Sequence, residues 1–269
     1  MHDNRNKEVI KRVEKGMMKA NRTRNTFAIV AVALTTFMIT TVFSLGINYK
    51  ENMELTSVRT SGTNANVSLA MPTNAQEKEI RDLDYVKMVG TQYMIGSVAG
   101  KNEADRDLAI AMQYYDNTEW EKHYKEAISN INGNYPKKEN EIMLSEDALS
   151  QLGIKKPKLD MEIPLSYVSK DGEQKDTFTL SGWFRSYTGT GMAFLSESYC
   201  QEHGYTLQNS GVLSISLDNP KNNFYDIQDD ITLNENQTFQ GSVSMSSSNG
   251  SVYAMIILLV FFIIGRGYL

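Results

Sequence analysis

The dominant feature of the hydrophobic pattern is an uncharged run over residues 27–47, FAIVAVALTTFMITTVFSLGI. At about 1.5 Å per residue, a helix of this length spans roughly 31 Å, close to the hydrocarbon core of a bilayer. Its polar members are threonines and one serine, whose hydroxyl groups can bond to carbonyls of the preceding turn. A buried core helix of a soluble protein is the competing interpretation, but such helices rarely lack charge on every face. The pattern therefore predicts a transmembrane helix.

Charge is distributed unequally on the two sides of this run. Residues 1–26 hold eight Lys or Arg and three acids, a net charge of +5, whereas the rest of the chain holds 19 bases and 29 acids. Because positive residues favour the cytoplasmic side, we expect a cytoplasmic N-terminus and an extracytoplasmic segment over residues 48–251. A cleaved signal peptide is the main alternative, but the apolar run is too long and no small-residue cleavage site follows Gly46.

The segment before the membrane helix is amphipathic. In residues 4–20, one helical stripe is apolar and the other positions are mostly basic; the stripe consists of Val9, Ile10, Val13, Met17 and Ala20. This pattern predicts a helix that leads into the membrane. Three roles are compatible with it: lying on the inner leaflet, binding a cytoplasmic partner, or acting as a solvated flank that only sets topology.

A second apolar run, residues 252–264, is short for a membrane helix. As a helix it would reach only about 20 Å, less than the roughly 30 Å of the bilayer core. We expect residues 252–269 to be the start of a second transmembrane helix, so that the sequence is a truncated form of a longer protein. The Ser-rich residues 242–251 are expected to be flexible.

Between the apolar runs, the pattern predicts an α+β extracytoplasmic domain with a mixed sheet and short helices. Tyr49 to Leu55 should continue the membrane helix out of the bilayer. Strands are expected over residues 67–71, 86–98, 107–115, 141–144 and 212–217, with a hairpin of 161–169 and 176–184 that turns at 170–173 around Asp-Gly. Helices are expected over residues 76–83, 118–131, from a cap at Ser145 to Leu152, 197–203 and 223–231.

Composition and motifs exclude several function classes. The acidic middle of the chain makes nucleic acid an unsuitable partner. The single cysteine, Cys200, excludes an internal disulfide and a Cys-based metal cluster, and we expect it to be a half-buried helix residue. No two histidines are spaced i, i+4, and neither the Gly96–Lys101 stretch nor Gly189-Thr-Gly191 has the spacing of a nucleotide-binding loop. The sequence thus predicts no catalytic, cofactor-binding or metal-binding residue.

Three stretches of the chain resemble the FtsX-like ABC transporter permease family. The first is KANRTRN, residues 19–25, which runs directly into the apolar helix. The second extends from Gly133-Asn-Tyr-Pro136 through NEIMLS, residues 140–145, to Leu152-Gly153, and is similar to a segment of the MacB-like extracytoplasmic core domain. The third is the following strand, FTLSG, residues 178–182. Their shared order along the chain is more specific than any one of them.

The resemblance implies a permease (transmembrane) subunit, or a fragment of one, of a mechanotransmission-type ABC transporter. Such a subunit couples ATP hydrolysis by a cytoplasmic ABC ATPase to the extracytoplasmic domain, in antimicrobial peptide resistance or export or in lipoprotein handling. It implies no enzyme activity, no cofactor because the partner subunit binds ATP, a homodimer or heterodimer of permeases, and a multi-pass parent in the cell membrane. The expected partner-contact residues are Lys19, Asn21, Arg22 and Arg24. Family members usually carry Gly-Asp where this chain has Leu159-Asp160, so that turn is expected to differ.

Two other interpretations stay open at this point. The first is a two-helix membrane receptor with an extracytoplasmic ligand-sensing domain. A receptor needs a cytoplasmic output module, and the 26 residues before the first membrane helix are too few for one. The second is an extracellular enzyme tethered by a signal anchor, for which the sequence offers no catalytic motif.

Overall fold

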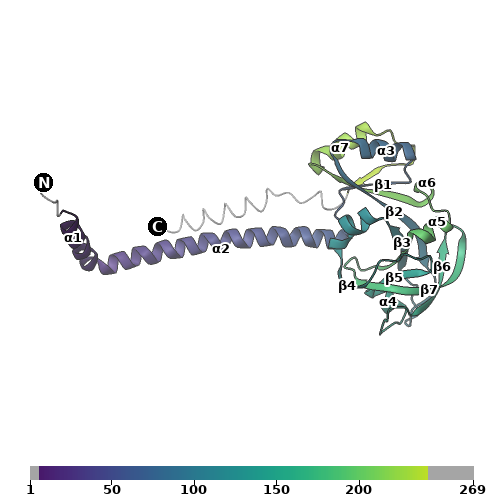
Figure 1. The fold of residues 1–269 in the computed structure, drawn as a ribbon, viewed down its shortest axis with the longest axis horizontal. Helices are drawn as coiled ribbons and strands as arrows, with labels where there is room; N and C mark the ends of the chain where they lie inside the picture. Colours follow the sequence, from purple (N-terminus) through teal and green to yellow (C-terminus); the bar gives the residue numbers. More distant parts are fainter. Residues whose placement is uncertain (1–5, 242–269) are drawn as a thin grey trace. The chain divides into compact units, whose positions relative to one another are not determined.

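The computed structural model describes residues 6–241 (Figure 1). Within them, the residues up to Asn52 form one compact unit and those from Met53 onward form another. The predicted flexible segment, residues 242–251, and the predicted second membrane helix, residues 252–269, lie outside the described residues.

The first unit is helical, as predicted. Helix α1 spans Asn6–Ala20, and helix α2 spans Arg22–Ser61. Of the described helices, α2 alone is long and apolar enough to cross a membrane. The prediction that this helix continues past the apolar run is confirmed, and it extends beyond Leu55 to Ser61.

The threonines of the apolar run bond within their own helix. The hydroxyl groups of Thr35, Thr36 and Thr41 donate to the carbonyls of Ala31, Val32 and Phe37 at 2.8, 2.9 and 2.8 Å. Each of these hydroxyls therefore has an acceptor four residues back, which removes most of the cost of placing it in lipid.

The second unit is an α+β domain built on one mixed sheet, which confirms the predicted fold class. Its strands are β1 Val67–Ala70, β2 Val86–Val98, β3 Ile110–Tyr115, β4 Ser129–Gly133, β5 Glu141–Ser145, β6 Glu162–Ser169, β7 Gly172–Arg185, β8 Gly191–Leu195, β9 Gly211–Leu217 and β10 Phe239–Gly241. Its helices are α3 Asn74–Asp82, the π-helix η1 Glu119–Tyr124, the 3-10 helix η2 Lys125–Ala127, α4 Glu146–Gln151, α5 Glu197–Glu202, α6 Leu207–Ser210 and α7 Pro220–Asp230. The strand order is β10-β1-β9-β2-β3-β8-β5-β7-β4, and β6 pairs with both β2 and β7.

The domain has two main hydrophobic cores that share strand β2. In the first core, helices α3 and α7 cover the antiparallel strands β1, β9 and the start of β2, and Figure 1 shows both helices beside β1. Its fully buried side chains include Leu69, Ile80, Ile215 and Ile227. Apolar residues alternate with polar ones along β9, so that Leu213, Ile215 and Leu217 face this core while Ser214 and Ser216 lie on the opposite face, where they are also buried.

The second core lies inside a ring of strands. The pairings run from β2 through β3, β8, β5, β7 and β6 and return to β2, so this part of the sheet closes on itself. Buried side chains from all six strands fill the interior, among them Ile95, Met112, Leu144, Phe178 and Leu195 together with Leu165. Closure removes two sheet edges that would otherwise be exposed.

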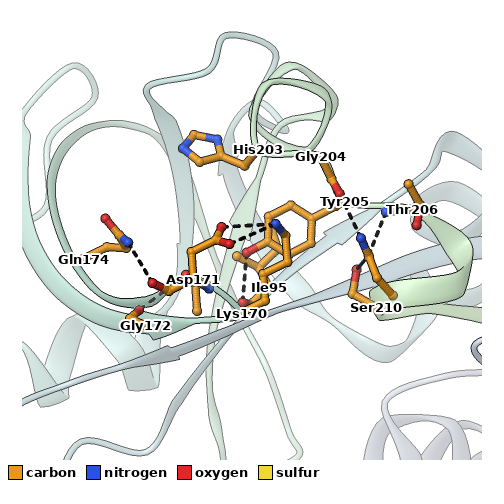
Figure 2. A network of polar contacts seen from close by, with 12 residues as sticks. Ile95, Lys170, Asp171, Gly172, Gln174, His203, Gly204, Tyr205, Thr206 and Ser210 are labelled. Carbon is orange, nitrogen blue, oxygen red and sulfur yellow. Dashed lines mark hydrogen bonds and ion pairs between the residues drawn. The ribbon is translucent and has the colours of Figure 1, made fainter.

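The ring closes at a short pairing that we call the seam, in which residues 96–98 of β2 face residues 167–169 of β6. Gly96 permits the close approach, because a Cβ atom there would lie 1.9 Å from the carbonyl oxygen of Val168. Figure 2 shows the side chains beside the seam. The Tyr205 hydroxyl donates to the Ile95 carbonyl at 3.2 Å, and the Lys170 ammonium lies 5.1 Å from the centre of the Tyr205 ring.

Three local predictions need correction. Ser169 pairs with Gly172, so the hairpin turns at Lys170-Asp171, and Gly172, with φ +93°, begins β7 instead of occupying the turn. The helix expected over 118–131 ends at Ala127 and gives way to β4, because the free edge of β7 offers ladder hydrogen bonds to that backbone. The strand expected over 107–115 begins at Ile110, with one isolated bridge between Lys101 and Asp107.

We predict that Gly96→Ala destabilises the domain, because its methyl group would displace the backbone of β6 at the seam. The expected loss is about 1–3 kcal/mol of unfolding free energy or more. Ser97→Ala, at an exposed neighbouring position, should change it by about 0.5 kcal/mol or less. Urea unfolding followed by tryptophan fluorescence measures this in the purified chain, since both tryptophans, Trp120 and Trp183, lie in the domain. Equal stability of the two variants would contradict the role given to the seam.

Candidate functional site

The predicted partner-contact residues lie at the break between the two N-terminal helices. Lys19 is in the last turn of α1, while Arg22 and Arg24 are in the first turn of α2, and all three are exposed. Asn21 is the half-buried residue between the helices; its N–H donates to Met17 O at 3.0 Å. The four residues are therefore neighbours along the chain and present a basic surface just before the apolar run.

At its other end, α2 is bonded into the domain through side chains around residues 59–64. The Arg59 guanidinium lies 4.6 Å from the centre of the Tyr187 ring, and the Tyr187 hydroxyl lies 2.8 Å from Ser129 Oγ. The Asn64 N–H donates to the His123 carbonyl at 3.0 Å, and the Asn64 amide donates to the Glu126 carboxylate at 2.9 Å. We call this set of contacts the joint. Through Arg59, it connects α2 to Tyr187, and through Asn64, just after the end of α2, it connects the chain to η1 and η2.

The π-helix at the joint carries a buried acid–base pair. The Glu119 and His123 side chains are 2% and 0% exposed, and His123 Nδ1 lies 2.7 Å from Glu119 Oε2. His123 Nε2 lies 3.0 Å from Ser216 Oγ, which belongs to β9 and points away from the first core, so the chain of contacts reaches the other face of that strand. Gly90 on β2 leaves room for it, because a Cβ atom there would be 2.4 Å from Glu119 Oε2.

Through Glu119 and His123, η1 contacts Gly90 of β2 and Ser216 of β9. The opposite face of η1 packs on the ring of strands. Trp120 and Tyr124 of η1 pack with Phe184 and Phe194 on the outside of the ring of strands. The π-helix therefore lies between β2 and β9 on one side and the outside of the ring of strands on the other. Single π-turns of this kind are rare and are frequent at functional sites.

Sequence reasoning missed this pair. The signal was present, because Glu119 and His123 are four residues apart in a helical stretch and each directly precedes an aromatic residue of its apolar face, Trp120 or Tyr124. Neither residue could be identified as buried from the sequence alone. The residues that surround them, Gly90 of β2 and Ser216 of β9, are distant in the chain.

A hollow of about 530 Å³ is lined in part by Trp120 and Glu121 of η1 and by Lys125 of η2. Aromatic side chains form part of its wall, namely Tyr114, Tyr115, Trp120 and Tyr135. Its charges nearly balance: Lys125 is paired with Glu121 at 2.7 Å, and Asp116 accepts from the Glu119 N–H at 2.7 Å. The hollow thus offers few charged groups that are not already engaged.

The described residues give little support for metal or thiol chemistry. Among residues 6–241, no group of three or more His, Cys, Asp or Glu side chains is placed to hold a metal ion. Cys200 lies on α5 as predicted, but it is fully buried instead of half-buried. Burial raises the pKa of its thiol to about 12, so it stays protonated and unreactive near neutral pH.

The middle motifs of the chain come together in space. Residues 141–145 of the second motif form β5, and residues 178–182 lie beside it on β7; the Thr179 N–H donates to the carbonyl of Asn140, just before β5, at 2.7 Å. The start of the second motif is bonded to the third, since the Asn134 N–H donates to the Ser181 carbonyl at 2.9 Å. Gly133 and Gly182 face each other across β4 and β7, where side chains would collide with the opposite backbone.

Comparisons with known proteins find similarity at the level of structure. No protein-family model matches the chain, and no curated protein sequence matches it. Among similar solved structures, the periplasmic region of MacB from Actinobacillus actinomycetemcomitans is 6% identical with a TM-score of 0.40, covering 72% of this chain and 94% of that one. The extracellular domain of the ABC-type transporter YknZ from Gram-positive bacteria is 12% identical with a TM-score of 0.41, covering 66% of this chain and 100% of that one.

We predict that the buried pair is more sensitive to losing one partner than to losing both. His123→Leu leaves the Glu119 carboxylate buried without its partner and should cost about 3–5 kcal/mol of unfolding free energy. Glu119→Leu combined with His123→Leu should cost clearly less than the sum of the single changes. The measurement is urea unfolding followed by tryptophan fluorescence.

The matched control is Lys125→Leu, which breaks the exposed i, i+4 pair of Lys125 with Glu121 on the same segment. It should cost at most about 1 kcal/mol. If His123→Leu costs no more than Lys125→Leu, the buried pair does not stabilise η1 in the way described.

Proposed function

We propose that the chain is the permease subunit, or part of one, of an ABC transporter of the mechanotransmission type. ATP hydrolysis by a cytoplasmic partner would move the extracytoplasmic domain by way of α2. The observation that carries this proposal is the continuity of α2, a single helix of 40 residues that contains the uncharged run and ends in the domain.

The length and composition of α2 suit it to transmit movement. Forty residues of helix extend about 60 Å, roughly twice the thickness of the bilayer core. The helix contains no proline and a single glycine, Gly46, so its sequence provides no obvious kink. A displacement at its cytoplasmic end would therefore reach the domain without being absorbed by a hinge.

The joint gives that displacement a path into the domain. Movement of residues 59–64 would act on η1 and η2 through the hydrogen bonds of Asn64 with His123 and Glu126. From η1, the Glu119–His123 pair continues to Ser216 on β9, while Trp120 and Tyr124 contact the ring of strands. Both parts of the domain would respond together, because η1 contacts β9, a strand of the first core, and also the outer side of the ring of strands.

The cytoplasmic end of α2 is the proposed place of contact with the ATPase. Lys19, Asn21, Arg22 and Arg24 would face an acidic surface of that partner, and the partner would bind the ATP. The chain itself would perform no catalysis and would work as a homodimer or heterodimer of permeases. Antimicrobial peptides and lipoproteins are the substrate classes implied by the sequence resemblance.

Co-purification tests this proposal. The intact parent protein, tagged and expressed in its own cells, should recover an ABC ATPase in mild detergent, identified by mass spectrometry. Arg22→Glu with Arg24→Glu should lower that recovery about tenfold or more, since a loss of 1.4 kcal/mol in binding is already a factor of ten.

The control is Arg5→Glu with Lys7→Glu, which makes the same change of net charge farther from α2 and should leave recovery unchanged. Absence of any ABC ATPase from the unaltered sample would overturn the proposal. Recovery of a signalling kinase in its place would favour the receptor.

A further inference from the structure

Helix α1 exposes an apolar stripe that its own unit does not cover. Val9, Ile10, Val13 and Met17 are 59%, 55%, 54% and 65% exposed. Their spacing of i, i+1, i+4 and i+8 places them along one side of the helix. Four large apolar side chains in one stripe are typical of a surface that is covered by a membrane or by a partner protein.

The rest of α1 is strongly basic. Lys11, Lys15 and Lys19 repeat every four residues on another face, where they line a shallow hollow with Arg12 and Gly16. The acids of the helix are Glu8 and Glu14 only. An apolar stripe on one side of a helix with a row of lysines on the other side matches an anionic membrane surface, because the stripe can enter the acyl boundary while the long lysine side chains reach the phosphates.

Chain connectivity brings α1 to that surface. The uncharged run begins at Phe27, and the last residue of α1 is Ala20. The intervening residues, if helical as in α2, extend about 10 Å, which is comparable to the headgroup layer of one leaflet. Once α2 crosses a bilayer, the end of α1 is therefore held near headgroup depth, and its binding to lipid becomes an intramolecular event.

We propose that α1 is an anionic-lipid-binding helix. The stripe from Val9 to Met17 lies at the boundary between headgroups and acyl chains, and Lys11 and Lys15 contact lipid phosphates. This goes beyond the proposed coupling to an ATPase and requires only that α2 crosses the membrane. It would fix the depth at which α2 begins, next to Arg22 and Arg24.

Lipid-depth quenching in the full chain tests the proposal. A fluorophore is attached at Val13→Cys or, as the matched control on the opposite side of α1, at Glu8→Cys; the native Cys200 is buried and does not compete for label. The chain is reconstituted into vesicles of phosphatidylcholine, alone or mixed with phosphatidylglycerol, that contain lipids with a nitroxide on the acyl chain. Both leaflets have the same composition, so the direction of insertion does not affect the result.

In the anionic vesicles, the label at Val13 should be quenched several times more strongly than the label at Glu8. The difference should shrink in phosphatidylcholine alone and in the variant Lys11→Gln, Lys15→Gln. Equal quenching of the two labels in anionic vesicles would overturn the proposal. So would a difference that is unaffected by the lysine substitutions, because the helix would then bind lipid without recognising its charge.

A protein partner gives a different result. If purified ATPase protects the Val13 label from a water-soluble quencher while lipid nitroxides leave it unaffected, the stripe is a protein-binding surface and the lipid proposal is wrong. The proposed ATPase coupling would survive that outcome, and the lipid proposal would survive a failure to recover an ATPase.

Discussion

Much of the arrangement follows from the need to satisfy backbone hydrogen bonds in lipid. In hydrocarbon, the N–H and C=O groups of residues 27–47 have no water to bond, so the segment crosses a bilayer only as a helix. The threonine hydroxyls obey the same constraint by bonding to carbonyls of their own helix. Helix α2 continues past the apolar run without an intervening proline, so the membrane segment and the start of the domain are one element.

Helix α2 ends close to the π-helix η1, which contacts several strands of the domain. Strand β2 contributes to both cores, and η1 lies between β2 and β9 on one side and the outside of the ring of strands on the other. The joint brings Asn64 to the carbonyl of His123, the residue whose side chain is paired with Glu119 in the interior. A buried acid–base pair costs desolvation and is a poor source of stability compared with apolar packing. Its value here is positional, because it holds η1 against β2 and β9 while the opposite face of η1 packs on the ring of strands.

Sequence pattern was a good guide where local signals agree with the fold. The uncharged run, the capping serine before α4 and the apolar alternation of β2 and β9 each depend on nearby residues, and each was predicted. Residues 128–131 were predicted wrongly because Ile128 and Ile131 continue a helical spacing, whereas the edge of β7 imposes strand pairing on the backbone. The seam and the joint could not be predicted, since each depends on segments that are distant in the chain, such as Gly96 with Val168 and Asn64 with His123.

The most direct test of the central claim is to interrupt α2 between the apolar run and the joint. Asn52→Pro removes a helical hydrogen bond at an exposed position, and Asn52→Ala is the control that keeps the helix. With the partner ATPase in lipid nanodiscs, ATP should change hydrogen exchange over residues 119–127 in the unaltered chain and in Asn52→Ala. In Asn52→Pro the ATPase should still bind, but the ATP-dependent change should be lost. An unchanged response in Asn52→Pro would contradict transmission through α2.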